Sequence, residues 1–360
     1  MKIVFLLPCS GEMPAGGLKI VYQYADGLAG RGHEITVVHP SFLSSVPVGF
    51  GFGLRSYLLN YMKQAVNGTW GPDRWFRFKY PVKLLWTPAL HRYFIPHADA
   101  YVATSWLTAE KLASWPSISH TRLYLIQHLE TWGGPEDRVL STWRAGLTNI
   151  VIARWLEAIA HENGQKAIYI PNCVDFDSFN CDQPVEDREP TRVAMLYHDF
   201  AWKGSADGIQ ALKIAKGRVP NLTTEMFGVP DPPPDLPEWI RYRRNPPQQE
   251  LRALYNRAAI FVAPSWTEGW GLPPSEAMMC GAAVAATDIN GHREFCIDGE
   301  TALMAPAQNP LRLADCIVRL VTNAGLRMQI AVRGHEYIKQ FTWTKALDAF
   351  EKALGVSIYS

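Results

Sequence analysis

The sequence predicts an α/β protein built from two doubly wound, parallel-sheet domains that face each other across a cleft. Strand and helix signals alternate from the first residue, as they do where crossover helices join parallel strands. One acidic, proline-containing stretch, residues 181–190, interrupts this alternation, which then starts again. The 360 residues are also enough for two domains that each bury a core of their own.

The first domain is expected over residues 1–170. It opens with the apolar strand 2–8 and a glycine-containing loop, which lead into a helix at residues 18–32 and a strand at 33–40. This order of elements is typical of the strand-loop-helix-strand unit of a parallel sheet. Further short apolar runs that indicate buried strands lie at residues 100–104, 122–128 and 149–153.

The second domain is expected over residues 171–342 and repeats the pattern. In chain order we expect a strand at 191–199, a helix at 204–218, a strand at 222–228, a proline-rich loop at 229–237, a helix at 248–258, a strand at 259–265, a helix at 275–281 and a strand at 282–288. A last helix, about residues 343–355, is a candidate to pack back on the first domain. Because ligands of open parallel sheets bind outside the carboxyl ends of the strands, the cleft is expected to hold the site.

The composition restricts the class of the protein. The net charge of +1 gives no overall attraction to nucleic acid or to acidic partners. The six cysteines show no paired metal-ligand spacing, which in a chain of this size indicates reduced thiols. The apolar start is shorter than the core of a signal peptide, and no apolar run is long enough to span a membrane. We therefore expect a cytoplasmic protein.

Two carboxylates, Glu268 and Glu276, flank a strand-to-helix turn that also holds two glycines and two prolines. Glycines bring bare backbone N–H groups close to a ligand, and prolines preset the first helical turn, whose N-terminus attracts phosphate. Carboxylates repel phosphate, so these glutamates are better suited to accept hydrogen bonds from neutral hydroxyls such as those of sugars. Taken alone, Glu276 could merely favour a helix start, and Glu268 could be a solvated loop residue.

The eleven residues EGWGLPPSEAM, which start at Glu268, closely resemble the Glu-x7-Glu signature of the retaining GT-B glycosyltransferases, in particular glycosyltransferase family four. A tryptophan stands where the family usually has phenylalanine. The resemblance implies a GT-B fold of two Rossmann-like domains, with Glu268 on hydroxyls of the donor sugar and Glu276 on the ribose of the nucleotide. It also implies that the amides of the intervening loop lie near the sugar and the diphosphate: Gly269, Trp270, Gly271 and Leu272.

Three further segments resemble the same family. Gly16 and Gly17 match its N-terminal glycine loop beside the donor diphosphate, although a simple turn would also explain the pair. Lys203 matches the lysine that neutralises the diphosphate, whereas His198 replaces an arginine and would be cationic only if its pKa rises. His128, at the end of a predicted strand, matches a histidine that contacts the donor sugar near its reacting carbon. For both histidines a structural role is the alternative.

The segment PNCVDFDSF resembles the family's Pro-Asn-Gly-Val-Asp motif at the domain junction, with a cysteine where glycine is usual. Its Asp175 and Asp177 spell an Asp-x-Asp, which binds metal in another glycosyltransferase fold. Here they fall between the domains, and the resemblance implies no required metal. By family position, the nucleobase pocket is expected near Phe227–Gly228 and Tyr242–Asn245.

These resemblances imply an enzyme that moves a sugar, with retention of anomeric configuration, from a UDP-, GDP- or dTDP-sugar to a carbohydrate or lipid-linked glycan acceptor. Such a reaction would serve the synthesis of bacterial-type surface polysaccharides. The donor would occupy the second domain and the acceptor the first, with no cofactor. Two alternatives stay open: another GT-B enzyme, such as a phosphorylase or nucleotide-sugar epimerase, and a non-catalytic carbohydrate-binding protein with this fold.

Residues 55–97 are locally basic in a chain of almost no net charge. Seven cations lie between Arg55 and Arg92, where the single acid is Asp73, which leaves a local net charge of +6. The cations are Arg55, Lys63, Arg74, Arg77, Lys79, Lys83 and Arg92. Interleaved aromatic residues make this mixture suited to an anionic membrane surface, and we expect peripheral docking on the inner face of the membrane. A folded insertion with core aromatics and solvated cations is the alternative, and no nucleic-acid motif accompanies the segment.

Overall fold

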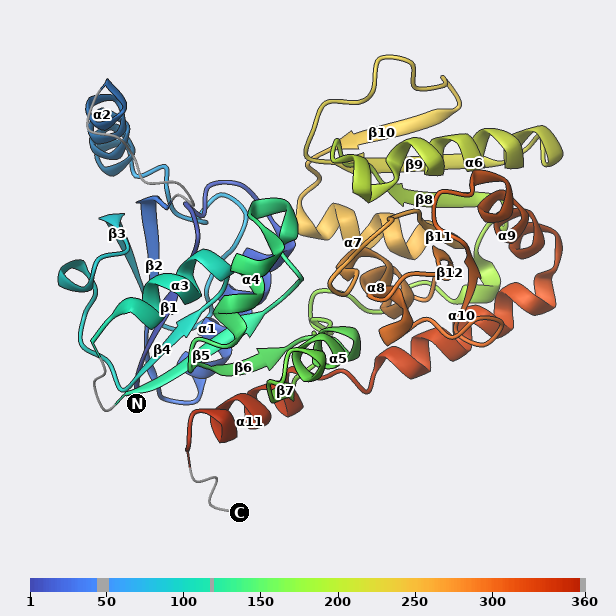
Figure 1. Ribbon diagram of the computed structural model, residues 1–360. Coiled ribbons are helices and arrows are strands. Elements are labelled where there is room, and N and C mark those ends of the chain that lie inside the picture. Colours follow the sequence, from blue (N-terminus) through green and yellow to red (C-terminus); the bar gives the residue numbers. More distant parts are fainter. Residues whose placement is uncertain (44–51, 117–119, 357–360) are drawn as a thin grey trace. The chain divides into compact units, whose positions relative to one another are not determined.

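The computed structural model describes residues 1–43, 52–116 and 120–356 and divides the chain into two compact units (Figure 1). The first unit contains Met1–Asn172 together with Thr344–Ser360, and the second contains Cys173–Trp343. Each is organised around a parallel sheet, so the predicted pair of parallel-sheet α/β domains is confirmed. These units are the first and the second domain below.

The sheet of the first domain has seven parallel strands in the order β3-β2-β1-β4-β5-β6-β7. Their bounds are β1 (Lys2–Leu6), β2 (Glu34–Phe42), β3 (Val82–Ala89), β4 (Ala100–Ala103), β5 (Thr121–Ile126), β6 (Thr148–Val151) and β7 (Ala167–Tyr169). The chain order reverses between β1 and β4, so the loops after these strands border the place where such sheets bind ligands. Strand β3 is not among the predicted strands, because most of its side chains are only partly buried.

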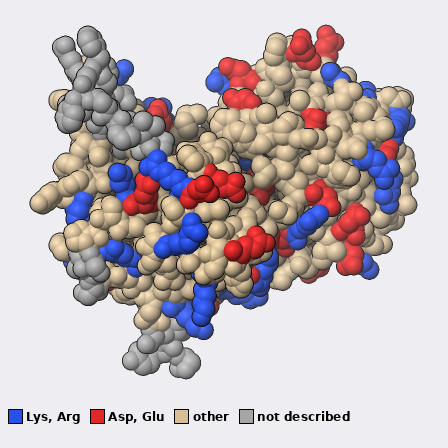
Figure 2. Space-filling model, in the orientation of Figure 1, with Lys and Arg blue, Asp and Glu red and all other residues tan. Residues whose placement is uncertain are grey.

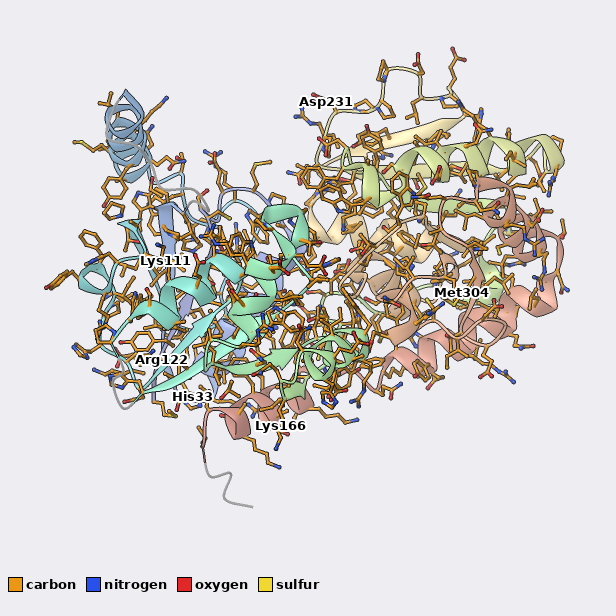
Figure 3. All side chains as sticks on the ribbon, viewed as in Figure 1. His33, Lys111, Arg122, Lys166, Asp231 and Met304 are labelled. Atoms are coloured by element: carbon orange, nitrogen blue, oxygen red, sulfur yellow. The ribbon has the colours of Figure 1, made fainter. Side chains whose placement is uncertain are left out.

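Helices connect the strands of the first domain. They are α1 (Gly16–Gly30), α2 (Phe52–Asn67), α3 (Trp106–Ser114), α4 (Glu136–Trp143) and α5 (Arg154–Glu162). The last helix, α11 (Trp343–Ala353), packs against this domain: the ring of Phe350 lies 6.1 Å from that of Phe5 and 4.8 Å from that of Tyr24. Glu351 accepts hydrogen bonds from Arg31 at 2.5 Å and from His33, labelled in Figure 3, at 2.9 Å.

Helix α2, blue in Figure 1, stands out from the body of the first domain. A column of stacked aromatic rings connects it to β3. The ring of Tyr61 on α2 lies 5.8 Å from that of Trp86 on β3, and the Trp86 ring lies 5.5 Å from that of Trp70. The indole N–H of Trp86 also donates to the carbonyl of Tyr61 at 3.4 Å. These contacts attach α2 to β3 through Tyr61.

The second domain has six parallel strands in the order β10-β9-β8-β11-β12-β13. Their bounds are β8 (Arg192–Leu196), β9 (Thr223–Gly228), β10 (Ile240–Arg244), β11 (Ile260–Ala263), β12 (Ala283–Thr287) and β13 (Ala302–Ala305). The helices are α6 (Ser205–Arg218), α7 (Gln248–Arg257), α8 (Leu272–Met279), α9 (Pro310–Thr322) and α10 (Ala324–Ile338). Neither β13 nor α9 and α10 is predicted from the sequence.

Small residues allow helices to approach the centre of the second sheet. Strand β12, with the sequence AVAAT, is buried along its whole length, and both α9 and α10 contact it. Helices α6 and α9 lie side by side, as do α8 and α10 (Figure 1). Within the described residues, no helix combines the length and the apolar character needed to cross a lipid bilayer.

Candidate active site

The loop between β11 and α8 carries the Glu-x7-Glu residues and leaves the start of α8 open. Gly271 precedes the helix with φ +109°, a left-handed conformation that glycine adopts without strain. Prolines occupy the first turn, and no side chain caps the helix. Pro273 and Pro274 have no N–H, and the N–H of Ser275 donates to the carbonyl of Gly271 at 3.3 Å, so Leu272 supplies the uncapped backbone N–H of this turn. An uncapped N–H at a helix N-terminus can bind an anion.

Glu268 forms an ion pair with Lys203. The Nζ atom of Lys203 donates to both carboxylate oxygens of Glu268, at 2.8 and 2.9 Å, and Ser265 Oγ donates to one of them at 2.9 Å. Burial alone would raise the pKa of Glu268, but the charge and hydrogen bonds of Lys203 hold that pKa below its ordinary value. Two residues that the sequence assigns to separate parts of a donor thus form a single unit.

A left-handed glycine places Lys203 beside the Glu268 loop. Lys203 ends a short 3-10 turn, and Gly204 follows with φ +62°. A Cβ atom at Gly204 would lie 2.0 Å from the carbonyl oxygen of Pro264, so only glycine fits there. The N–H of Trp266 donates to the carbonyl of Trp202 at 2.7 Å, which ties the loops after β8 and β11 together.

His198 follows β8 in the same loop as Lys203. Its backbone N–H donates to Ser205 Oγ at 2.9 Å, and its Nδ1 lies 3.1 Å from the N–H of Phe200 and 3.0 Å from a carboxylate oxygen of Asp199. Burial, followed by the charge of Lys203, lowers the pKa of His198, whereas Asp199 acts in the opposite direction. A cationic His198 would therefore need a further negative charge, such as a diphosphate.

Glu276 lies on the second turn of α8 and is buried, with 6% of its surface exposed. The hydroxyl of Tyr255, on α7, donates to its Oε2 at 3.3 Å. Burial raises the pKa of Tyr255 far above its ordinary value, so this side chain stays a hydroxyl donor. The sequence gives no reason to single out Tyr255, which is 21 residues away from Glu276. The packing of α7 on α8 brings the two side chains together.

Trp270 turns its side chain away from the loop and into the core. The indole is 2% exposed and packs 5.5 Å from the ring of Phe295 and 5.0 Å from that of Phe341. Its Nε1 is buried without a hydrogen-bond partner. Any contact of Trp270 with a ligand must therefore come from its backbone, as it must for the two glycines of the loop.

In the first domain, Gly16 and Gly17 open α1 after an N-cap residue that makes no side-chain hydrogen bond. Gln127, at the end of β5, donates from Nε2 to the carbonyl of Gly17 at 3.1 Å. A Cβ atom on Gly17 would lie 3.4 Å from that nitrogen, so the glycine permits this close approach. Gln127 therefore holds the glycine loop, which follows β1, against the end of β5.

His128 follows Gln127 and lies among aromatic rings. Its ring centre is 4.5 Å from that of Trp132 and 5.3 Å from that of Trp155, and its Nδ1 donates to the carbonyl of Leu129 at 3.1 Å. Close in sequence, Glu130 accepts from the N–H of Trp106 at 2.6 Å. Burial raises the pKa of Glu130 to about 7. The structure thus places His128 and Glu130 at the carboxyl end of the first sheet.

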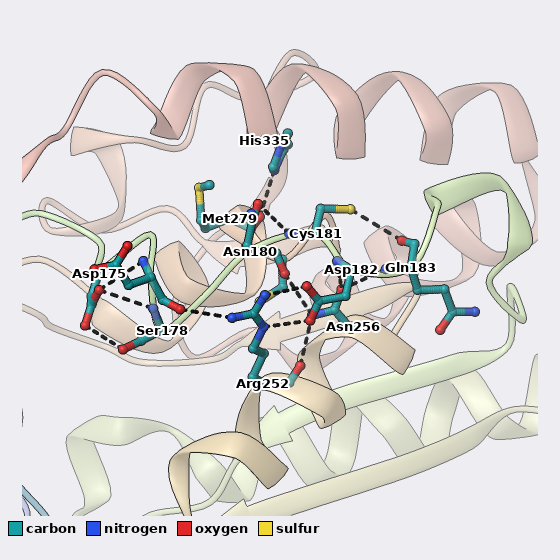
Figure 4. A network of polar contacts seen from close by, with 12 residues as sticks. Asp175, Ser178, Asn180, Cys181, Asp182, Gln183, Arg252, Asn256, Met279 and His335 are labelled. Carbon is teal, nitrogen blue, oxygen red and sulfur yellow. Dashed lines mark hydrogen bonds and ion pairs between the residues drawn. The ribbon is translucent and has the colours of Figure 1, made fainter.

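Asp175 shapes a turn. Its carboxylate accepts from the N–H groups of Asp177 and Ser178 and, at 2.5 Å, from Ser178 Oγ (Figure 4). Arg252 donates to the carbonyl of Asp177 at 3.0 Å and to the carboxylate of Asp182. Among the residues that the structure describes, no three histidine, cysteine, aspartate or glutamate side chains gather as a metal site would require. Through Asp182, the acidic stretch 181–190 is thus bound to the second domain.

The expected nucleobase segments meet at the ends of β9 and β10. The N–H of Asn245, a residue with φ +43°, donates to the carbonyl of Gly228 at 2.6 Å. The hydroxyl of Tyr242 donates to the carbonyl of Pro230 at 2.7 Å, and its ring lies edge-on to Tyr197 at 5.9 Å. Burial raises the pKa of Tyr242 to about 12.

Comparison with known proteins assigns the part of the chain that contains these loops. Residues 195–323 match the family model described as Glycosyl transferases group 1. This stretch resembles a glycosyl transferases group 1 domain. The domain contains Lys203 and both glutamates of the Glu-x7-Glu stretch, and it spans the second sheet from the end of β8 through β13.

Relatives of the group 1 domain include both short and long matches. A D-inositol 3-phosphate glycosyltransferase of Corynebacterium diphtheriae is 30% identical over 116 residues, which cover 32% of this chain and 27% of that relative. A phosphatidyl-myo-inositol mannosyltransferase of Mycobacterium leprae is 24% identical over 96% of this chain and 94% of its own length.

Solved structures match the whole chain in fold. Sucrose-phosphate synthase from Thermosynechococcus elongatus has a TM-score of 0.71 at 17% identity, over 99% of this chain and 100% of that one. Anabaena HepE in complex with UDP-glucose gives the same TM-score, identity and coverage. With two parallel-sheet domains, this confirms the predicted GT-B fold.

Proposed function

We propose that the protein is a retaining glycosyltransferase that moves a sugar from a nucleotide diphosphate sugar to a carbohydrate or lipid-linked glycan acceptor. The observation that carries this proposal is the Lys203–Glu268 ion pair beside the open N-terminus of α8. It combines a cation and the backbone of a helix N-terminus, which suit a diphosphate, with a carboxylate, which suits sugar hydroxyls. The group 1 domain match covers all of these parts.

In the proposed reaction, the ammonium of Lys203 exchanges the carboxylate of Glu268 for the donor diphosphate. Glu268 is then released to accept hydrogen bonds from hydroxyls of the donor sugar, while Glu276 accepts from the ribose. The N–H groups of Gly269–Leu272 and Lys203 stabilise the leaving diphosphate as its charge develops. Its phosphate oxygen takes the proton of the acceptor hydroxyl, so the reaction needs neither a metal nor a protein base, and a chelator should leave transfer unchanged.

In this proposal the donor binds the second domain and the acceptor binds the first. Anabaena HepE was solved in complex with UDP-glucose, which makes UDP-sugars the first donors to test before GDP- and dTDP-sugars. The acceptor would lie on the first domain near His128 and Gly16–Gly17. The mannosyltransferase relative is named for phosphatidyl-myo-inositol, a lipid, which supports a lipid-linked acceptor.

The two glutamates should separate in a binding experiment. Glu276→Ala is expected to weaken UDP and UDP-glucose alike, by about 3- to 10-fold, because both contain the ribose that Glu276 contacts. Glu268→Ala is expected to lower turnover but to spare UDP, whose diphosphate then meets an unpaired Lys203. Isothermal titration calorimetry with UDP and UDP-glucose measures the affinities, and a transfer assay measures the turnover. The assignment of roles is wrong if both variants lose the same affinity for UDP.

Turnover assays with UDP-, GDP- and dTDP-sugars test the alternative functions. Turnover that depends on orthophosphate would indicate a phosphorylase, and a changed donor sugar without an acceptor would indicate an epimerase. A wild-type protein that binds glycans but neither transfers nor hydrolyses any UDP-, GDP- or dTDP-sugar would be a carbohydrate-binding protein.

The proposal includes an anionic membrane surface as a partner of the first domain. On the face drawn in Figure 2, acidic and basic side chains are interspersed, so the attraction has to be local. One face of α2 is apolar and exposed, with Leu59, Met62 and Val66 at 59%, 60% and 82%. Exposed cations of the basic segment accompany them: Lys63, Arg74, Arg77, Lys79 and Lys83. An exposed apolar helix face and exposed cations in the same segment of the chain suit the interface of an anionic bilayer.

Part of the basic segment has a structural role instead. The rings of Trp75, Phe76 and Phe78 lie 5.2 to 5.6 Å from that of the buried Tyr22, so these aromatics belong to the core. The guanidinium of Arg92 lies over the ring of Tyr101 at 5.6 Å. The side chain of Arg55 lies outside the described residues. The candidate docking surface is therefore narrower than residues 55–97.

Liposome co-sedimentation tests the docking surface. The protein is expected to bind vesicles that contain phosphatidylserine, less so as salt is raised, and the triple change Arg74→Ser, Arg77→Ser and Lys79→Ser should reduce binding by up to roughly 100-fold. Each cation near an anionic surface contributes about 1 kcal/mol. A matched variant replaces three exposed cations of the second domain with serine: Lys213, Arg241 and Arg333. Equal loss in both triple variants, or no binding at low salt, would contradict membrane docking and favour a soluble acceptor.

A further inference from the structure

His292 is a buried histidine, 1% exposed, in the short turn that follows β12. Its Nδ1 lies 2.9 Å from the carbonyl oxygen of Thr287 and 3.3 Å from Thr287 Oγ1. A carbonyl oxygen can only accept, so Nδ1 carries a proton. Thr287 Oγ1 in turn donates to the carbonyl of Ser265 at 2.5 Å, which connects the histidine to the end of β11.

The opposite edge of the ring faces the loop that carries Glu268. A Cβ atom on Gly271 would lie 2.9 Å from Cδ2 and 3.2 Å from Nε2 of His292. A Cβ atom on the preceding Gly291 would lie 2.4 Å from the carbonyl oxygen of Glu268. His292 therefore contacts the loop at its helix end, and its neighbour contacts the loop at Glu268.

The charge state of the ring makes Nε2 a hydrogen-bond acceptor. Burial lowers the pKa of His292, and the opposing effect of Glu268 is smaller. With the single ring proton held on Nδ1, Nε2 presents a lone pair, for which no donor is available within the described residues. Nε2 thus has no donor from the described protein, and a ring that is 1% exposed offers water little access, which leaves this acceptor for a donor on a bound ligand.

The chemistry of the donor substrate indicates which group this is. Diphosphate oxygens accept hydrogen bonds and cannot donate to Nε2, whereas sugar hydroxyls can. The ribose hydroxyls are assigned to Glu276, which sits further along α8. Within the proposed site, this leaves the hexose that Glu268 also contacts.

We propose that Nε2 of His292 accepts a hydrogen bond from one hydroxyl of the donor sugar, which makes His292 a specificity-determining residue for that sugar. This inference rests on the proposed function, because it requires a nucleotide sugar in this site. It adds a contact from the turn after β12 to those from the loops after β8 and β11. All of these loops belong to the second domain.

His292→Asn tests the proposal, because an asparagine N–H can keep the bond to the Thr287 carbonyl while Nε2 is lost. Affinities are measured by calorimetry for UDP-glucose, GDP-mannose and dTDP-glucose, and for UDP, GDP and dTDP. The variant is expected to bind the preferred nucleotide sugar about 2- to 10-fold less tightly and the matching diphosphate unchanged. His292→Gln, whose amide oxygen can approach the position of Nε2, should recover part of the loss.

A second measurement separates sugar contact from loop positioning. Analogues of the preferred donor with one hydroxyl replaced by fluorine cannot donate at that position. One such analogue should lose affinity for the wild-type protein but not, beyond the loss already present, for His292→Asn. Equal losses for sugar nucleotide and diphosphate, or a wild-type protein indifferent to every fluorine, would overturn the inference. A wild-type protein that binds no nucleotide sugar would instead overturn the proposed function, and the inference with it.

Discussion

Replacing Lys203 with alanine is expected to lower the affinity for UDP by about 10- to 100-fold, because hydrogen bonds to charged groups are worth roughly 1.5–3 kcal/mol. The affinity for uridine, which has no phosphate, should not change. Calorimetry with the two ligands measures the difference. Lys213→Ala, which removes an exposed lysine of α6, is the control for the loss of one positive charge from the domain.

The partner of Lys203 complicates this experiment in a predictable way. Without the lysine, burial raises the pKa of Glu268, and a carboxylate would be left without its counter-ion. The double variant Lys203→Ala, Glu268→Gln removes both charges. It should also lose affinity for UDP and keep its affinity for uridine. If Lys203→Ala weakens uridine as much as UDP, the lysine maintains the loop and does not bind phosphate.

Replacing Gly204 with alanine is expected to lower the free energy of unfolding by roughly 2–4 kcal/mol. The left-handed backbone penalises a side chain, and the new Cβ would lie 2.0 Å from the Pro264 carbonyl oxygen. The loops after β8 and β11 must then separate, which should also break the Lys203–Glu268 ion pair and abolish most activity.

The control for this change is Gly217→Ala in α6, the helix that Gly204 precedes. No atom lies within 4 Å of a Cβ at Gly217, and alanine favours a helix over glycine by about 1 kcal/mol. Urea titration should therefore show higher stability for Gly217→Ala and lower stability for Gly204→Ala. Equal stability of Gly204→Ala and the wild-type protein would mean that the backbone at this position relaxes freely.

Some of the strands that the sequence predicts are buried along almost their whole length. Strand β11, with all four residues buried, shows a continuous apolar run, and so does most of β1. Strand β3 mixes partly buried, exposed and proline residues, so its pattern resembles a loop. The helices α9 and α10 follow each other directly, which departs from the strand-helix alternation that guided the prediction.

The candidate site was predictable where the chemistry is local in sequence. The loop with Glu268 and the open start of α8 can be recognised from adjacent residues. The pairing of Lys203 with Glu268 spans 65 positions, and that of Tyr255 with Glu276 spans 21, so both depend on which loops the sheet order brings together. His292 could have been found only by listing the polar residues that follow each predicted strand, because it lies in the turn after β12, which ends at Thr287.

The position of α11 has a consequence for the synthesis of the protein. The first domain begins to emerge from the ribosome before the second, yet the helix that covers Phe5 and Tyr24 emerges after residues 173–343. Until then those two rings lack the cover of Phe350, and Arg31 and His33 lack the carboxylate of Glu351. The domain that starts folding first is thus completed last. A nascent chain that stalls before α11 would present an apolar patch of the kind that chaperones bind.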